Sequence, residues 1–446
     1  MKREIDILHG PIAGKVLRFA LPLAATGILQ QLFNAADVAV VGRFVGKNAM
    51  AAVGSNSSLI ALLVNLFVGV SLGAGVVLST LTGQGDRGRV HKAVHTSILV
   101  ALISGVFVTV VGQIIAAPVL RLMGVPEDVF DMAVLYLRIY LLGMPVILLY
   151  NFESAIFRSQ GDTSTPLFCL VISGVANVLL NVFFVCGLHM TVEGVALATI
   201  LSNLISAALL FFFLLRSKTA IRVELRALRI DRRLLSMMLK IGIPAGVQSM
   251  VFSLSNVIVQ SAVNSLGADV MAASSAAFNI EVFVYYIINA FGQASTTFVG
   301  QNYGAGQPDR CRKATRICLV LDLCFTGALA AVMLALGRPL LSIFNGDPVI
   351  IDYGYVRLQY ILLAELLNVV IEVLSGSMRG YTYSLVPAAI TLVGICGVRV
   401  GWVYTVFRQQ SEYGVLMRAY PLSWAVTASA LAVAYLVVMR MIKQKE

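Results

Sequence analysis

Long apolar stretches recur along the whole chain, separated by short polar stretches rich in Lys, Arg, Gly and Pro. Each is about as long as the α-helix that crosses the hydrocarbon core of a bilayer. The pattern predicts twelve membrane-spanning helices, at 16–42, 55–82, 93–117, 133–156, 166–188, 194–216, 237–264, 275–303, 315–337, 354–378, 386–408 and 415–441. Because several exceed twenty residues, we expect tilted or bent helices, with Pro22, Pro145 and Pro244 as bend points.

The chain carries an internal repeat. Gly46-Lys-Asn-Ala-Met-Ala-Ala52 returns as Gly267-Ala-Asp-Val-Met-Ala-Ala273, and Arg158 and Arg379 lie at the same offset of 221 residues (379 − 158). The repeat predicts a six-helix lobe at 1–216, a basic cytosolic linker at 217–235 and a second six-helix lobe at 236–446. Since each copy has an even number of helices, the copies should be parallel repeats about an axis along the membrane normal.

Basic residues are distributed unequally between the predicted loops. The loops after odd-numbered helices hold only six of the 33 Lys and Arg residues, whereas the termini and the other loops hold most of the rest. Positively charged loops remain in the cytoplasm, so both termini are expected to be cytoplasmic. We expect no removable signal peptide and a multi-pass protein of the cytoplasmic (inner) membrane. The linker is either a partly helical connector at the lipid surface or a solvated segment without a further role.

Composition narrows the possible functions. With 59% hydrophobic and 12% charged residues, the chain differs from an average soluble domain. The net charge of +11 is dispersed among membrane loops, which argues against a nucleic-acid partner. The six cysteines have no paired spacing, and neither a phosphate-binding loop nor HExxH is present. His91 and His95 have metal-ligand spacing but no further ligands nearby. We therefore expect that the protein needs no cofactor and is not an enzyme.

Polar residues inside the first predicted lobe form a candidate ion site. Asp37 lies one turn after Asn34 on the first helix, and Asn177 and Asn181 lie four residues apart on the fifth. Ionisable groups inside a membrane need a partner, a water-filled cavity or a function. These residues predict a pocket that binds a proton or a small cation such as Na⁺. The alternative is a hydrogen-bonded seam that holds the helices together.

The second predicted lobe contains a different set of polar residues. Glu281 and Tyr285 lie on one face of the eighth helix, Glu365 and Glu372 lie on the tenth, and Asn256 lies on the seventh. A cavity lined by carboxylates and an aromatic ring would bind an organic cation. The alternative for each Glu is an ion pair with a neighbouring Arg. None of these acids, nor Asp37, is duplicated at the repeat offset, whereas Arg158 and Arg379 are. We therefore assign the acids to binding or coupling, and the duplicated arginines, with Pro22, to gating or structure.

Several motifs resemble those of one transporter family. These are Phe298-Val-Gly-Gln-Asn-Tyr-Gly-Ala-Gly306, Phe33-Asn-Ala-Ala-Asp37, Phe157-Arg-Ser-Gln-Gly-Asp162, and Glu372-Val-Leu-Ser-Gly-Ser-Met-Arg-Gly380. In this order and spacing, the chain resembles the multidrug and toxic compound extrusion (MATE) family over nearly its whole length. The resemblance implies an all-α membrane protein with two six-helix lobes around a central cavity. It also implies an antiporter that exports cationic amphiphilic compounds in exchange for Na⁺ or H⁺ by alternating access.

The resemblance implies a role for Asp37, but the fifth helix departs from the family's pattern. Asp37 matches the first-helix carboxylate that couples cations in many relatives. Many relatives have Asn-x₃-Asp on the fifth helix, whereas this chain has Asn177 and Asn181. Glu281 or Glu372 would then share the coupling. We expect small organic cations and membrane lipid as partners, and a functional monomer.

Two alternative functions were compared with this prediction. A related flippase for a lipid-linked saccharide would need a basic cavity for the pyrophosphate, and few basic residues lie in the interior of the predicted helices (Arg138, Arg357 and Arg399). A membrane-embedded enzyme would need a nucleophile–base pair or a metal-binding cluster, and the sequence contains neither. Ion-coupled efflux is therefore the leading prediction.

Overall fold

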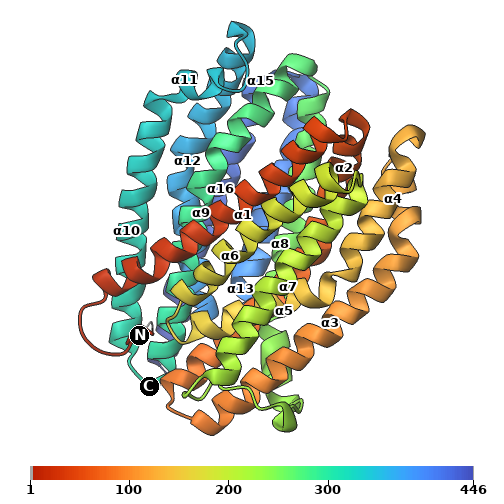
Figure 1. Ribbon diagram of the computed structural model, residues 1–446. Helices are drawn as coiled ribbons and strands as arrows, with labels where there is room; N and C mark the ends of the chain where they lie inside the picture. Colours follow the sequence, from red (N-terminus) through yellow and green to blue (C-terminus); the bar gives the residue numbers. More distant parts are fainter. Residues whose placement is uncertain (1–3, 445–446) are drawn as a thin grey trace. The chain divides into compact units, whose positions relative to one another are not determined.

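The computed structural model describes residues 4–444, and every regular element in that range is helical (Figure 1). The first half contains α1 (Ala13–Phe44), α2 (Lys47–Gly83), α3 (Arg87–Leu122), α4 (Glu127–Leu142), α5 (Met144–Ser159), α6 (Ser164–Val182), η1 (Phe183–Gly187), α7 (Val192–Arg216) and η2 (Leu225–Ala227). The second half contains α8 (Arg232–Asn264), α9 (Ala268–Gly304), α10 (Pro308–Ala335), α11 (Gly337–Ser342), α12 (Pro348–Gly380), α13 (Leu385–Thr391), η3 (Leu392–Gly397), α14 (Val398–Trp402), η4 (Val403–Phe407), α15 (Tyr413–Met417) and α16 (Ala419–Lys443).

The predicted membrane spans are confirmed. Among the described residues, eleven helices are long and apolar enough to cross a membrane, and a bent pair raises the number to twelve. That pair is α4 and α5, which meet at an angle of 49°. Pro145 lies in the first turn of α5, at the predicted bend. Pro22 and Pro244 lie inside α1 and α8, each of which is one continuous helix.

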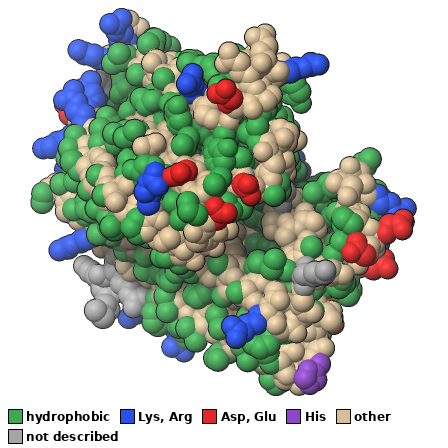
Figure 2. All heavy atoms as spheres, turned by 90° about the horizontal axis from the view of Figure 1, so that it is seen from above, with side chains coloured by type: hydrophobic (Ala, Val, Ile, Leu, Met, Phe, Trp, Pro, Cys, Tyr) green, Lys and Arg blue, Asp and Glu red, His purple; other side chains and the backbone are tan. Residues whose placement is uncertain are grey.

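Side chains on the outer faces of these helices match a lipid environment. Large apolar residues such as Ile114, Leu179 and Val433 are between 62% and 71% exposed. Figure 2, a view from above onto one end of the helices, shows hydrophobic side chains together with acidic and basic groups there. Outer faces with such exposed apolar residues would be unfavourable in water and suit a multi-pass membrane protein.

The helices pack into two compact units. One contains Ala25–Gly246, and the other contains Asp6–Ala24 together with the chain from Val247 onward. This division differs from the sequence-based lobe boundaries. The start of α1 belongs to the second unit because its residues contact that unit. The rings of Phe19 and Phe298 are nearly perpendicular, with their centres 5.7 Å apart, and Arg310 donates hydrogen bonds to the carbonyl of Ile7.

The start of α8 packs on α2 within the first unit. A Cβ atom on Gly69 of α2 would lie 2.2 Å from the backbone of Gly246, and one on Gly73 would lie 2.3 Å from the carbonyl oxygen of Met238. Only glycine permits so close a helix–helix approach, as in the small-residue interfaces of membrane proteins. One face of α8 is thus buried against α2.

The linker is docked rather than extended in solvent. Ile221 and Val223 are buried in the core of the first unit. His95 joins the linker to α3, because its Nε2 lies 2.9 Å from the backbone nitrogen of Glu224 and its Nδ1 lies 2.7 Å from the carbonyl oxygen of His91. Asp231 accepts hydrogen bonds from the first turn of α8, and the N–H of Leu234 is the main cause that lowers its pKa.

The repeat also appears in the backbone. Gly46 and Gly267, at the same offset, precede α2 and α9 with φ of 123° and 103°. Gly85 and Gly306 follow the same helices with φ of 70° and 68°. The third pair differs, because Gly161 has φ of 81° whereas its counterpart Thr382 has φ of 71°. A β-branched residue in the left-handed region is strained.

This pair predicts opposite effects of two substitutions. Thr382→Gly should stabilise the protein by about 1 kcal/mol, because glycine adopts positive φ without a steric penalty. Gly161→Thr should destabilise it by more, since a Cβ there would also lie 2.7 Å from the carbonyl oxygen of Ile5. Thermal unfolding of the purified variants in detergent measures both effects. Equal shifts of the same sign would contradict the expectation.

Candidate functional site

Asp37 lies at the centre of a buried polar cluster in the first unit. Its carboxylate accepts a hydrogen bond from Nδ2 of Asn181 on α6 at 2.6 Å and one from the hydroxyl of Thr199 on α7 at 3.3 Å. Asp37 is 8% exposed and Asn181 is fully buried. Among residues 4–444, no Lys, Arg or His forms an ion pair with Asp37. In the described chain, the hydrogen-bond donors to this carboxylate are therefore all neutral.

A polar seam extends from this carboxylate along α6 and α7. The Asn181 amide also donates to Oδ1 of Asn177 at 3.2 Å, and Asn177 donates to the hydroxyl of Ser202 at 3.4 Å. Residues four apart on a helix lie on one face, which is why the side chains of Asn177 and Asn181 meet, with Asn181 bonded to Asp37 on α1 and Asn177 to Ser202 on α7. Oδ1 of Asn181 is buried without a hydrogen-bond partner among the described residues. This oxygen and the Asp37 carboxylate are the type of ligand that a small cation or a proton requires.

The helix that supplies both asparagines ends irregularly. Immediately after Asn181 and Val182, α6 continues as the π-helical segment η1. At the repeat offset, η4 forms a second π-helical segment in the other half, and η3 precedes it. Segments of π-helix are uncommon and often lie near functional sites. Their presence in both copies indicates a shared property of these helices.

The remaining residues predicted for coupling or gating form no hydrogen bond with this cluster among the described residues. Asn34 lies one turn before Asp37 on α1, but its side chain is exposed and has no hydrogen bond to the described residues. Arg158 is half-buried at the end of α5. Arg379 is buried at the end of α12 and donates to Oε1 of Gln248 at 2.9 Å. Pro22 lies within the part of α1 that belongs to the second unit.

In the second unit, Glu281 forms a buried ion pair. The Arg357 guanidinium donates to its carboxylate through two nitrogens, at 2.5 and 3.1 Å, and both residues are buried. From the sequence, an ion pair with a neighbouring Arg is the alternative to cation binding for each Glu. For Glu281, the structure contains that partner. A cation would have to displace Arg357 to bind this carboxylate.

Asn256 also contacts an arginine. Nη1 of Arg399 donates to Asn256 Oδ1 at 3.0 Å, and its Nε donates to the hydroxyl of Ser423 at 3.2 Å. The Arg399 guanidinium lies 4.2 Å from the ring centre of Tyr420 and 5.4 Å from that of Trp424. Arg399 is fully buried and has no carboxylate partner among the described residues. Aromatic rings and neutral oxygens therefore stabilise its charge.

The other predicted substrate residues of the second unit lack basic partners within salt-bridge distance in the described chain. Glu365 is buried and accepts a hydrogen bond from Asn368 at 2.8 Å. Glu372 is half-buried two turns further along α12, and Tyr285 on α9 is 37% exposed. The partly exposed Glu372 and the exposed ring of Tyr285 are thus accessible, whereas Glu365 is buried and Glu281 and Asn256 are bonded to arginines.

Two further buried acids are not among the residues assigned from the sequence. Asp322 is fully buried on α10, with one oxygen bonded to Thr326 at 2.9 Å and the other without a partner among the described residues. Glu153 on α5 is fully buried, and neither of its oxygens has a hydrogen-bond partner among the described residues. The four-residue spacing of Asp322 and Thr326 was the available signal for the first. Nothing in the local pattern marks the burial of Glu153.

Comparison with known proteins shows which family shares these features. The MatE family model matches residues 22–183 and again 244–405, so the second match begins at nearly the repeat offset. "Probable multidrug resistance protein YoeA" of Bacillus subtilis is 28% identical over 92% of this chain and 90% of its own length. A probable multidrug resistance protein NorM of Thermotoga maritima is 26% identical over 87% and 84%. The "FAD transporter" of Shewanella oneidensis is 25% identical over 79% of each chain.

Solved structures show the same fold. An outward-facing multidrug resistance MATE transporter superposes with a TM-score of 0.92 at 20% identity, covering 100% of this chain and 99% of the other. A transporter from Pyrococcus furiosus, described as having a binding pocket of reverse polarity, superposes with a TM-score of 0.87 at 21% identity, covering 98% and 97%. Because the MatE model matches both halves and accounts for most of the chain, the protein belongs to the MatE family.

Proposed function

We propose that this chain is a secondary antiporter that exports cationic amphiphilic compounds in exchange for Na⁺ or H⁺. The observation that carries the proposal is the Asp37 carboxylate, buried among neutral donors with no basic partner in the described chain. A carboxylate in such surroundings is stable only when a proton or a cation neutralises it. Occupation of Asp37 therefore changes the relative stability of the transporter's conformations, which is the requirement for ion coupling.

The substrate class rests on the second unit and on the relatives. Glu365, Glu372 and the accessible ring of Tyr285 would attract a lipophilic cation. Several relatives are named as multidrug resistance or multidrug export proteins. The protein would act without a cofactor or enzymatic step, as a monomer in the cytoplasmic membrane with both termini in the cytoplasm. Solved relatives in outward-facing, bent and straight conformations support an alternating-access cycle.

A second candidate substrate carries phosphate groups. The observation in its favour is Arg399, a fully buried guanidinium with no carboxylate partner in residues 4–444. Arginine is the side chain best suited to bind phosphate. One relative is named as an FAD transporter, and a lipid-linked saccharide would present a similar pyrophosphate. The pairing of Arg357 with Glu281 reduces the positive charge available for such a substrate, so the cation remains our first choice.

Transport into everted membrane vesicles separates the two candidates. We expect vesicles that contain the protein to accumulate a fluorescent lipophilic cation such as ethidium, and not FAD, when an ion gradient is present. Vesicles without the protein provide the background. Accumulation of FAD alone would replace the first proposal with the second.

A further inference from the structure

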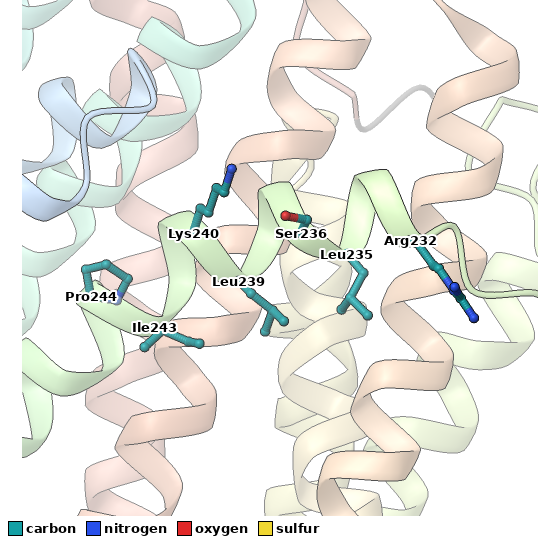
Figure 3. A pocket seen from close by; sticks show the side chains of 7 residues that line it. All are labelled: Arg232, Leu235, Ser236, Leu239, Lys240, Ile243 and Pro244. Atoms are coloured by element: carbon teal, nitrogen blue, oxygen red, sulfur yellow. The ribbon is translucent and has the colours of Figure 1, made fainter.

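An open groove runs along the outer face of α8, near the end that follows the linker (Figure 3). Its apolar side consists of Leu235, Leu239 and Ile243, which point the same way in Figure 3. These residues are four apart and so form one stripe on the helix. Arg232 lies at the end of the row, and Ser236 and Lys240 form the opposite edge. The volume is about 470 Å³, enough for part of a lipid molecule.

The basic residues of the groove are unpaired. Arg232 and Lys240 are exposed, and neither has an ion-pair or hydrogen-bond partner among the described residues. Lys240 is eight residues into a helix apolar enough to span the membrane, so it lies roughly 12 Å along the helix from Arg232. A lysine on a lipid-facing surface extends its ammonium toward the interface, where lipid phosphates lie.

The opposite face of α8 cannot provide a partner for these charges. Leu234, Met238 and Ile241 are buried in the core of the first unit, and Gly242 lies against Val70 of α2. The charges of Arg232 and Lys240 therefore point outward by necessity. The preceding linker adds exposed cations at Lys218, Arg222, Arg226 and Arg229, together with the exposed side chain of Leu225. Basic residues interleaved with exposed apolar residues are typical of a surface that contacts anionic lipid.

We propose that this groove binds an anionic phospholipid, with the phosphate at Arg232, a second positive charge at Lys240 on the opposite edge, and an acyl chain along Leu235, Leu239 and Ile243. Charge complementarity selects an anionic head group, and the apolar row selects a molecule that carries hydrocarbon chains. The site is independent of the transported substrate and of Asp37.

Native mass spectrometry of the full-length protein in detergent can test this site with phosphatidylglycerol and phosphatidylcholine of identical chains. We expect the wild type to retain phosphatidylglycerol preferentially. The double variant Arg232→Gln/Lys240→Gln should lose affinity for it by a factor on the order of ten or more. Arg87→Gln/Arg89→Gln removes two exposed basic residues at the start of α3 and should behave like the wild type. Lys240→Arg keeps the charge and should also retain the lipid.

Three outcomes would overturn the proposal. The first is equal binding of phosphatidylglycerol by the double variant and the wild type. The second is equal affinity for the two lipids, which would indicate a non-selective apolar surface. The third is full competition by glycerophosphoglycerol, which has no acyl chains and would indicate an anion site. If the double variant does not fold, Lys240→Gln alone should still lower the affinity for phosphatidylglycerol. An unchanged affinity in that variant would also overturn the proposal.

Discussion

Asp37→Asn is expected to abolish ion-coupled efflux while the protein remains folded in the membrane. Asparagine has the same shape and can still accept the hydrogen bond that Asn181 donates to Asp37. It cannot gain or lose a proton, and it holds a cation much more weakly than a carboxylate does. Cells that produce this variant should therefore extrude ethidium no faster than cells without the protein.

The matched control for this variant is Asn203→Ala. Asn203 lies one turn after Thr199 on α7, and among the described residues its side chain donates to the carbonyl of Thr199 alone. It belongs to the same helix but does not contact Asp37. We expect efflux near the wild-type rate from this control. Equal loss in both variants, at equal membrane abundance, would indicate a structural role for the cluster, as in the seam considered from the sequence.

Arg357→Leu is expected to destabilise the second unit strongly. The substitution leaves Glu281 buried without its partner, and breaking a buried ion pair from one side costs about 3–5 kcal/mol. Replacing both residues, as Glu281→Leu/Arg357→Leu, removes the unpaired charge and should restore much of the lost stability. The apparent Tm of the three proteins in detergent, followed by intrinsic fluorescence, provides the comparison.

This comparison also examines the assignment of Glu281. If Glu281 serves mainly as the partner of Arg357, the double variant should be close to wild type in stability and should still transport. A double variant that is stable but cannot transport would restore a functional role for the pair. A single variant as stable as the wild type would contradict the buried ion pair itself.

Much of the fold follows from the sequence because the membrane imposes a simple rule. Each spanning segment must be apolar and must satisfy its own backbone hydrogen bonds, so length and hydropathy alone locate the helices. The repeat offset of the sequence also holds for backbone conformation, because it relates the positive-φ residues Gly46 and Gly267, and likewise Gly85 and Gly306. The crossover of α1 between the two units could not be predicted, because it depends on packing between distant residues such as Phe19 and Phe298.

The candidate site was only partly predictable for the same reason. The four-residue spacing of Asn177 and Asn181 places both on one face of α6, and Asp37 meets them there. The pairing of Glu281 with Arg357 joins residues on two helices that are 76 positions apart, so no local spacing reveals it. Arg399 was counted as a sparse interior charge, whereas its aromatic surroundings come from Tyr420 and Trp424 on α16.

Transport in proteoliposomes with imposed gradients tests the central proposal of ion-coupled export most directly. Purified wild type and Asp37→Asn would be reconstituted at equal density, and ethidium movement would be followed under an Na⁺ gradient, a pH gradient or neither. We predict that the wild type concentrates ethidium against its own gradient under one of the two ions, and that Asp37→Asn does not. Accumulation by the variant at the wild-type rate, or wild-type accumulation without any gradient, would contradict the proposal.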